Sequence, residues 1–181
     1  QKTAYEIYQC DWSSDVCSSD LWTAAGRGIV HEEVPAEAGK AAHLFQIFVN
    51  LPATRQGAMP YAVSLEPEDV PIVETDGASI RVPLGEYGQA RSPLVSPTQI
   101  NLFDIRLDAG AELPVPIPSG QNCFVIPVKG RLTINGSPYD ADGSQIPAFP
   151  ASSDNQEIIL KAHDGAAQAA VFSGIPIRLQ G

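Results

Sequence analysis

The chain has 181 residues, with 11 basic and 21 acidic side chains and a formal net charge of −10 at pH 7. This charge argues against nucleic acid as a direct electrostatic partner. No apolar run approaches the roughly 20 residues that a membrane-spanning helix needs, so we expect no membrane contact. A chain of this length can bury a sizeable core and form one large or two small domains.

The first 21 residues do not look like natural protein sequence. Asp11–Leu21 reads DWSSDVCSSDL, which back-translates to a common sequencing-library adapter, and Gln1–Ile7 back-translates to the outer end of the same indexed primer. The alternative is a disordered leader rich in Ser and Asp. We predict a non-native tail over residues 1–21 and leave it out of the fold argument, although a folded state could include it.

Without this tail, Cys123 is the one remaining cysteine, and the net charge of residues 22–181 is −7. A single cysteine builds no disulfide framework, which fits a reducing compartment. Because Cys123 lies in an apolar run, we interpret it as a small buried side chain and not as a nucleophile.

The remaining sequence follows a β pattern. Its 16 Pro and 15 Gly residues separate short apolar runs, and no amphipathic helix is evident, so many short strands of a sandwich or barrel are predicted. Ser64–Asp69 is expected to form one short helical turn at most, and turns between strands are expected at Asp108–Gly110, Asn135-Gly136 and Asp142-Gly143. In Ile100–Leu107, the face with Phe103 and Ile105 is expected to point inward. The expected strands are His43–Leu51, Ser79–Leu84, Ile100–Leu107, Cys123–Gly130, Arg131–Gly136 and Ala169–Gly174.

One constellation near the start has the residue types of a metal site. Gly26 and Gly28 predict a tight turn, and the next residues, 29–34, read as a short strand. On a strand, residues two apart share a face, so His31 and Glu33 point the same way. One imidazole and one carboxylate are half of an octahedral nitrogen and oxygen site. The alternative is a surface histidine beside two solvated acids.

The string TAAGRGIVHEEVP, followed by HLFQIFVNLP, resembles the pirin family of the cupin superfamily. The resemblance implies an all-β fold of two double-stranded β-helix (cupin, or jelly-roll) barrels, with one iron in the first. Some members have flavonol (quercetin) 2,3-dioxygenase activity, and others are iron-dependent partners of transcription regulators or metabolic enzymes. We expect a partial first barrel over residues 22–95 and a second barrel over residues 96–181. The family also implies a cytoplasmic protein.

The resemblance assigns roles to residues of the first barrel. His31 and Glu33 match two metal ligands, with Fe(2+) or another divalent transition metal as the expected cofactor. Glu33 is also the candidate catalytic base, and His43 and Gln46 are candidates for the substrate pocket. For His43 the alternative is an ordinary, partly buried histidine. The expected partner is a small aromatic substrate such as a flavonol, or a protein.

The chain departs from the family at both ends. The family's other two ligands form a His-x-His before the Gly-Arg-Gly turn, and here residues 1–21 occupy that space. We therefore predict that metal binding is weakened or lost and that the chain as given is inactive. The family also continues beyond Gly181, so a second truncation is suspected. A barrel without its first strands would fold poorly, because backbone groups and apolar core would be exposed. The Ser/Asp-rich tail is not expected to supply an alternating apolar strand in their place.

The general cupin signature can also be aligned with the second barrel. Starting from Gly110, its two His positions fall on Pro116 and Pro118, its Glu position falls near Cys123, and its closing Gly matches Gly130. Because proline has no metal-binding side chain, we expect no metal there. His163 is expected to be a surface turn residue.

Overall fold

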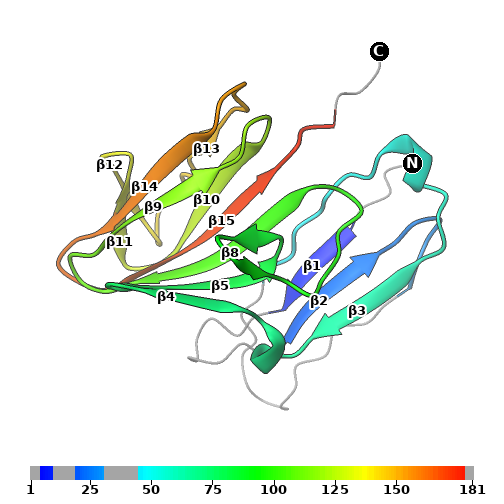
Figure 1. Cartoon of the computed structure of the whole chain (residues 1–181), viewed down its shortest axis with the longest axis horizontal. Coiled ribbons are helices and arrows are strands. Elements are labelled where there is room, and N and C mark those ends of the chain that lie inside the picture. Colours follow the sequence, from blue (N-terminus) through cyan, green and yellow to red (C-terminus); the bar gives the residue numbers. More distant parts are fainter. Residues whose placement is uncertain (1–4, 10–18, 31–44, 178–181) are drawn as a thin grey trace. The chain divides into compact units, whose positions relative to one another are not determined.

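The computed structural model describes residues 5–9, 19–30 and 45–177. The chain divides into two compact units, one comprising Gln1–Val70 with Ile177–Gly181 and the other comprising Pro71–Pro176. Strands dominate both units, and the helical segments described are two short 3-10 turns, Ala53–Arg55 and Pro67–Asp69 (Figure 1). In the part of the chain that the structure covers, no helix is both long and apolar enough to cross a membrane. The expected all-β class is confirmed, and Pro67–Asp69 lies within the one helical turn that was expected.

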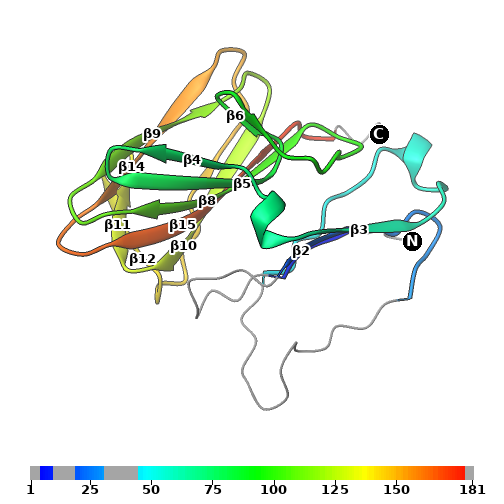
Figure 2. The same ribbon diagram turned by 60° about the horizontal axis from the view of Figure 1, so that its bottom comes forward.

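The unit Pro71–Pro176 consists of two antiparallel sheets stacked face to face (Figure 2). One sheet has the order β13-β10-β15-β8-β5-β4, and the other has the order β12-β11-β14-β9, so β9 is an edge strand. A short hairpin of β6 and β7 lies beside them. The bounds are β4 (Ile72–Thr75), β5 (Ala78–Leu84), β6 (Glu86–Tyr87), β7 (Ala90–Arg91), β8 (Ile100–Leu107), β9 (Glu112–Ile117), β10 (Asn122–Lys129), β11 (Arg131–Ile134), β12 (Ser137–Asp140), β13 (Ala148–Phe149), β14 (Gln156–Ala162) and β15 (Ala167–Gly174).

The core of this unit lies between the two sheets. Alternate residues of each strand point into it, as the two-residue period of a strand requires. Phe103 and Ile105 of β8 are in this core, so the inward face expected for Ile100–Leu107 is confirmed. The fully buried core residues from the other strands of both sheets include Ile80, Val82, Val115, Val125, Leu132, Leu160 and Val171.

The opposite face of β8 is buried as well, which the alternation alone did not indicate. Leu102 and Asp104 are 2% and 1% exposed. Gln168 of β15 donates a hydrogen bond of 2.7 Å to Asp104, and Arg81 of β5 lies 3.6 Å from the same carboxylate. Because β15 and β5 are the two neighbours of β8, this polar cluster ties three adjacent strands together.

The predicted turn at Asn135-Gly136 is confirmed between β11 and β12. Both residues have positive φ, +49° and +80°, as the turn type favoured in two-residue hairpins requires. The Asn135 side chain also accepts a hydrogen bond of 2.8 Å from the backbone N–H of Ile159 in β14. The turn residue therefore fixes its hairpin against the neighbouring strand.

The other unit contains a three-stranded antiparallel sheet of β1 (Tyr5–Gln9), β2 (Ser19–Ala24) and β3 (Tyr61–Leu65). All of β1 and the start of β2 come from residues 1–21, so the expectation that this stretch cannot supply a strand is wrong. Backbone hydrogen bonds do not depend on side chains, and the segment YEIYQ contains two Tyr and one Ile, residue types enriched in strands, which the Ser/Asp-rich composition of the rest of the tail obscured. Whether residues 1–21 derive from an adapter stays a prediction.

One further expectation differs from the structure. The described part of the strand expected over His43–Leu51 forms no strand, although Phe45, Ile47 and Val49 are half-buried and alternate with exposed residues. Local alternation is not sufficient without a partner strand. The compact units divide at Val70/Pro71, because β4 and β5 pair into the same sheet as β8, and the barrel boundary expected between residues 95 and 96 stays a prediction.

Candidate functional site

The predicted metal ligands His31 and Glu33, together with His43, lie outside the described residues. The turn that leads to them is described. Gly26 has φ of +49°, and a Cβ at this position would lie 2.2 Å from the carbonyl oxygen of Ala58. The backbone N–H of Arg27 donates a hydrogen bond of 3.1 Å to that same oxygen. Only glycine fits at position 26, so the packing of this unit itself requires the first glycine of the Gly-Arg-Gly turn.

The residues before this turn are buried, whereas the residue Val30 after it is exposed. Before it, β2 ends in the buried residues Trp22, Thr23 and Ala24. After it, Val30 is 98% exposed and, like Ile29, forms no strand, so the expected strand does not begin there. The candidate pocket residue Gln46 is exposed in a segment without secondary structure, and its role stays a prediction.

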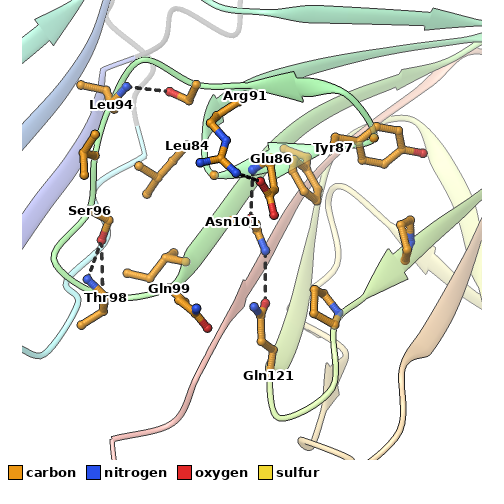
Figure 3. Close-up of a pocket in the computed structure, with 18 residues that line it drawn as sticks. Leu84, Glu86, Tyr87, Arg91, Leu94, Ser96, Thr98, Gln99, Asn101 and Gln121 are labelled. Carbon is orange, nitrogen blue, oxygen red and sulfur yellow. Dashed lines mark hydrogen bonds and ion pairs between the residues drawn. The ribbon is translucent and has the colours of Figure 1, made fainter.

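A pocket of about 580 Å³ lies within the unit Pro71–Pro176, where no site was expected (Figure 3). Its walls are the β6–β7 hairpin, the segment that connects β7 to β8, the start of β8 and the loop between β9 and β10. This volume is in the range of small-molecule sites in proteins. The lining side chains discussed below are Leu84, Glu86, Tyr87, Arg91, Asn101, Phe103, Pro116, Pro118 and Gln121.

A single glycine positions one wall of this pocket. At Gly85, φ is +84°, and a Cβ would lie 2.1 Å from the side-chain oxygen of Asn101. Because that space is free, the backbone N–H of Glu86 donates a hydrogen bond of 3.1 Å to the Asn101 Oδ1 atom. The pairing of β5 with β8 is irregular between Arg81 and Leu84, which turns the chain toward the hairpin.

Three buried polar side chains form a closed network beside the pocket. The Asn101 amide donates hydrogen bonds of 3.2 Å to Gln121 Oε1 and 3.1 Å to Ser173 Oγ. The Ser173 hydroxyl in turn donates a bond of 2.7 Å to Gln121 Oε1. Two donors therefore fix the Gln121 amide orientation. Among the residues that the structure describes, the Gln121 Nε2 atom donates to no protein acceptor.

Two aromatic rings form an apolar wall of the pocket. The rings of Tyr87 and Phe103 meet edge to face, with centroids 5.3 Å apart and an interplanar angle of 82°. Burial first, and then the negative charge of Glu157, raise the pKa of the Tyr87 phenol. The phenol is thus neutral at physiological pH, and its hydroxyl donates a 3.4 Å hydrogen bond to the carbonyl of Pro114.

The second-barrel signature lies on β9 and the loop that follows it. Pro116 and Pro118 are exposed, whereas the core-facing positions of β9 are Leu113, Val115 and Ile117. In the described ranges, no three His, Cys, Asp or Glu side chains come together in a way that could hold a metal ion. The signature positions instead contribute two proline rings to the pocket.

Two further sequence-based assignments in this unit are confirmed. Cys123 is 2% exposed within the core, and burial raises the pKa of its thiol to about 12, so it is a packing residue. His163 is exposed in the turn before β15. Neither side chain takes part in the pocket.

The sequence relatives of the chain indicate the class of protein to which it belongs. No family model matches the chain. Human pirin is 33% identical over 133 residues, which cover 73% of this chain and 45% of pirin. "Putative quercetin 2,3-dioxygenase PA3240" of Pseudomonas aeruginosa is 29% identical over 163 residues, covering 86% of this chain and 56% of that protein. The chain therefore spans about half the length of the curated relatives it matches.

Solved structures extend the comparison to the fold. GK1651 of Geobacillus kaustophilus superposes with a TM-score of 0.87 at 21% identity, covering 100% of this chain and 78% of that chain. A quercetin 2,3-dioxygenase of Acinetobacter baumannii gives a TM-score of 0.77 at 25% identity, covering 99% and 67%. The protein is thus an all-β protein of the cupin class. Within that class, the chain belongs to the pirin family, as the resemblance indicated, and its relatives are pirins and quercetin 2,3-dioxygenase-like proteins.

No sequence pattern predicted the pocket itself. Asn101 and Gln121 are 20 residues apart, and Ser173 follows Gln121 by 52 residues, so it is the pairing of β15 with both β8 and β10 that brings the network together. A Gly after a strand, as at Gly85, is a weak indication of a bulge or a close approach of the backbone. No local motif separates these residues from ordinary turn residues.

Proposed function

We propose that the natural protein is a pirin-like, metal-dependent cupin protein with flavonol 2,3-dioxygenase activity, and that Pro71–Pro176 corresponds to its second barrel. The observation that supports this is the position of His31 and Glu33 directly after the Gly26 turn, which the close approach of Ala58 restricts to glycine. The quercetin 2,3-dioxygenase names among the relatives support the substrate class.

The donor set fits a divalent transition metal such as Fe(2+). His31 offers an imidazole nitrogen and Glu33 a carboxylate oxygen, ligands that suit iron or nickel, and a pirin structure with nickel(II) has the same fold at 19% identity. When bound, the metal supplies Lewis-acid and redox chemistry toward the substrate and dioxygen. With two ligands instead of four, we propose that the chain as given binds metal weakly and is inactive.

The residues of the chain have separate roles in this proposal. The Glu33 carboxylate accepts the proton of the substrate hydroxyl, as a general base positioned beside the metal. His43 and Gln46 bind the substrate through hydrogen bonds, and the exposed amide of Gln46 is accessible to a ligand. A cytoplasmic location is part of this proposal.

The test begins with the source DNA upstream of the Trp22 codon. If that DNA encodes a His-x-His, the restored protein should bind one divalent metal ion and should bleach the near-visible absorption of quercetin in air. The Glu33→Gln variant should then lose turnover more than metal content, since glutamine retains a ligand oxygen but not the base. Wild-type turnover in this variant would refute the role of Glu33, and a source sequence without the His-x-His would refute the metal site.

A regulatory role is the second candidate, because the relatives of higher identity are named pirin without an activity. In that case the same metal is a redox switch, and oxidation changes a surface that binds a protein partner, as the family resemblance implies. The restored protein would then bind metal without bleaching quercetin. Its affinity for the partner would differ between the reduced and the oxidised states.

A further inference from the structure

We propose that the pocket of Pro71–Pro176 is a second binding site, for a small, neutral, planar molecule that carries a carbonyl oxygen. This inference goes beyond the proposed function, because it requires neither metal nor any of the residues His31, Glu33, His43 and Gln46. It rests on a donor group whose orientation is fixed, on apolar walls and on a rim whose charges balance.

The donor is the side-chain amide of Gln121. Gln121 is 6% exposed and lines the pocket, and its Oε1 atom accepts hydrogen bonds from Asn101 and Ser173. Its Nε2 atom carries two N–H groups, and in the described part of the chain no protein acceptor takes either of them. The Nε2 atom is not one of the fully buried polar atoms without a partner, so water reaches it through the pocket, and a ligand carbonyl would replace that water as the acceptor of its hydrogen bond.

The orientation of this amide is set before any ligand binds. Exchanging the Nε2 and Oε1 atoms would place N–H groups against the Asn101 amide, which is itself a donor. Asn101 cannot turn either, because its Oδ1 atom accepts the hydrogen bond from Glu86 that the space at Gly85 permits. The donor is therefore pre-organised, which lowers the entropy cost of binding a carbonyl group.

The walls favour a flat apolar body. Tyr87 and Phe103 supply aromatic surface, Pro116 and Pro118 supply two rigid rings, and Leu84 supplies an aliphatic contact. These side chains have few rotatable bonds to immobilise, so contact with them costs little conformational entropy. Several apolar walls around one oriented polar group are typical of small-molecule sites.

The charges of the pocket favour a neutral ligand. Glu86 and Arg91, its only acidic and basic lining residues, form an ion pair with each other across the β6–β7 hairpin. They leave no net charge to attract an anion or a cation. The Tyr87 hydroxyl already donates to Pro114. Gln99 and Gln121 both line the pocket with amide N–H groups that reach no acceptor in the described part of the chain, and Gln121 is the one whose orientation the network with Asn101 and Ser173 fixes.

The experiment titrates the ¹⁵N-labelled full chain with two matched probes in the presence of EDTA. 1-Indanone has a flat bicyclic body and one carbonyl oxygen, and indane is the same body without the carbonyl. In ¹H–¹⁵N correlation spectra, 1-indanone should shift the Gln121 side-chain amide and the Glu86 backbone amide saturably. It should bind about three to ten times more tightly than indane, which is the usual contribution of one hydrogen bond.

The variant Gln121→Glu tests the donor itself. It retains an oxygen for the hydrogen bonds from Asn101 and Ser173 but replaces the amide nitrogen with a second oxygen. Binding of 1-indanone should fall to the level of indane, and binding of indane should change less than about twofold. Gln145→Glu is the control, because Gln145 is exposed, does not line the pocket and gains the same charge. It should bind both probes like the wild type.

Several outcomes would overturn the proposal. The first is equal affinity of the wild type for the two probes. The second is the absence of a saturable shift up to about 10 mM of 1-indanone, a concentration range suited to ligands this small. The third is unchanged binding of 1-indanone in a folded Gln121→Glu variant. If that variant does not fold, the affinities of the wild-type protein for 1-indanone and for indane still test the proposal, because this comparison needs no substitution. EDTA removes the metal, so failure here leaves the proposed function untouched.

Discussion

A Cβ added to Gly26 would lie only 2.2 Å from the carbonyl oxygen of Ala58, which is closer than the two atoms can approach. The variant Gly26→Ala therefore combines a clash against backbone atoms with a φ of +49° that L-residues disfavour. We expect it to destabilise the first unit by about 1–3 kcal/mol. Urea unfolding followed by hydrogen exchange of the β2 and β3 amides measures this change.

Gly57→Ala is the matched control for that substitution. A Cβ added at Gly57 would meet no other atom within 4 Å, and the backbone there is not in the left-handed region. We expect an effect within about 0.5 kcal/mol, as for most surface substitutions. Similar losses in both variants would contradict a specific requirement for glycine at residue 26.

The two units should differ in protection from hydrogen exchange. In the first unit, Tyr61 and Val63 of β3 are 44% and 43% exposed, and β3 has one open edge within the described sheet. In the second unit, β8 and β15 are central strands with buried residues on both faces. We expect amides of β8 and β15 to exchange only by global opening and those of β2 and β3 to exchange much faster. Equal protection in the two units would show that the first unit is as well folded as the second.

Asp104 makes the stability of the second unit dependent on pH. Burial raises the pKa of its carboxyl, although the hydrogen bond from Gln168 and the charges of Arg81 and Arg106 lower it. The folded state thus binds the proton more tightly than the unfolded state does. The resulting stabilisation is complete below the ordinary Asp pKa of about 3.9 and is lost as pH rises through the higher folded pKa.

The variant Asp104→Asn should remove this dependence. Its urea midpoint should decline less than that of the wild type as pH rises from about 4 to 7, since the amide does not titrate. Asp154→Asn, at an exposed position, should retain the slope of the wild type. Parallel pH profiles for the wild type and Asp104→Asn would contradict the assignment.

The thiol of Cys123 should be unreactive in the folded protein. Its pKa is raised to about 12 by burial, and the thiolate is the reactive form. In a variant with Cys10 and Cys17 changed to Ser, labelling by a disulfide reagent at pH 8 should be more than about a hundredfold slower than in denaturant. Comparable rates under the two conditions would place Cys123 at an accessible position.

The sequence indicated those elements that local pattern determines. Ile100–Leu107 was predicted with the same bounds as β8, because its alternation is regular and Asp108–Gly110 ends it. Asn135-Gly136 was predicted as a turn because both positions require a positive φ. In contrast, β9 was not predicted, since Pro114 and Pro116 argue against a strand unless it lies at a sheet edge.

The errors have a common physical origin in long-range pairing. Residues 45–51 have a strand-like alternation and no partner strand, whereas Tyr5–Gln9 has a partner in β2 and forms a strand. The candidate metal site, predicted from a short motif, is not one of these errors and stays a prediction, because it lies outside the described residues. The pocket was not predicted, because Asn101, Gln121 and Ser173 become neighbours only in the folded sheet.

The prolines of β9 also limit whether a further strand can pair with the free edge of the four-stranded sheet. β9 pairs with β14 along one edge, and in the described sheet its other edge has no strand. Pro114 and Pro116 have no backbone N–H, so an incoming strand would find that edge without the regularly spaced donors that it requires. Pro116, which stands where the cupin signature has a metal-binding His, thus also helps to protect this sheet against edge-to-edge aggregation.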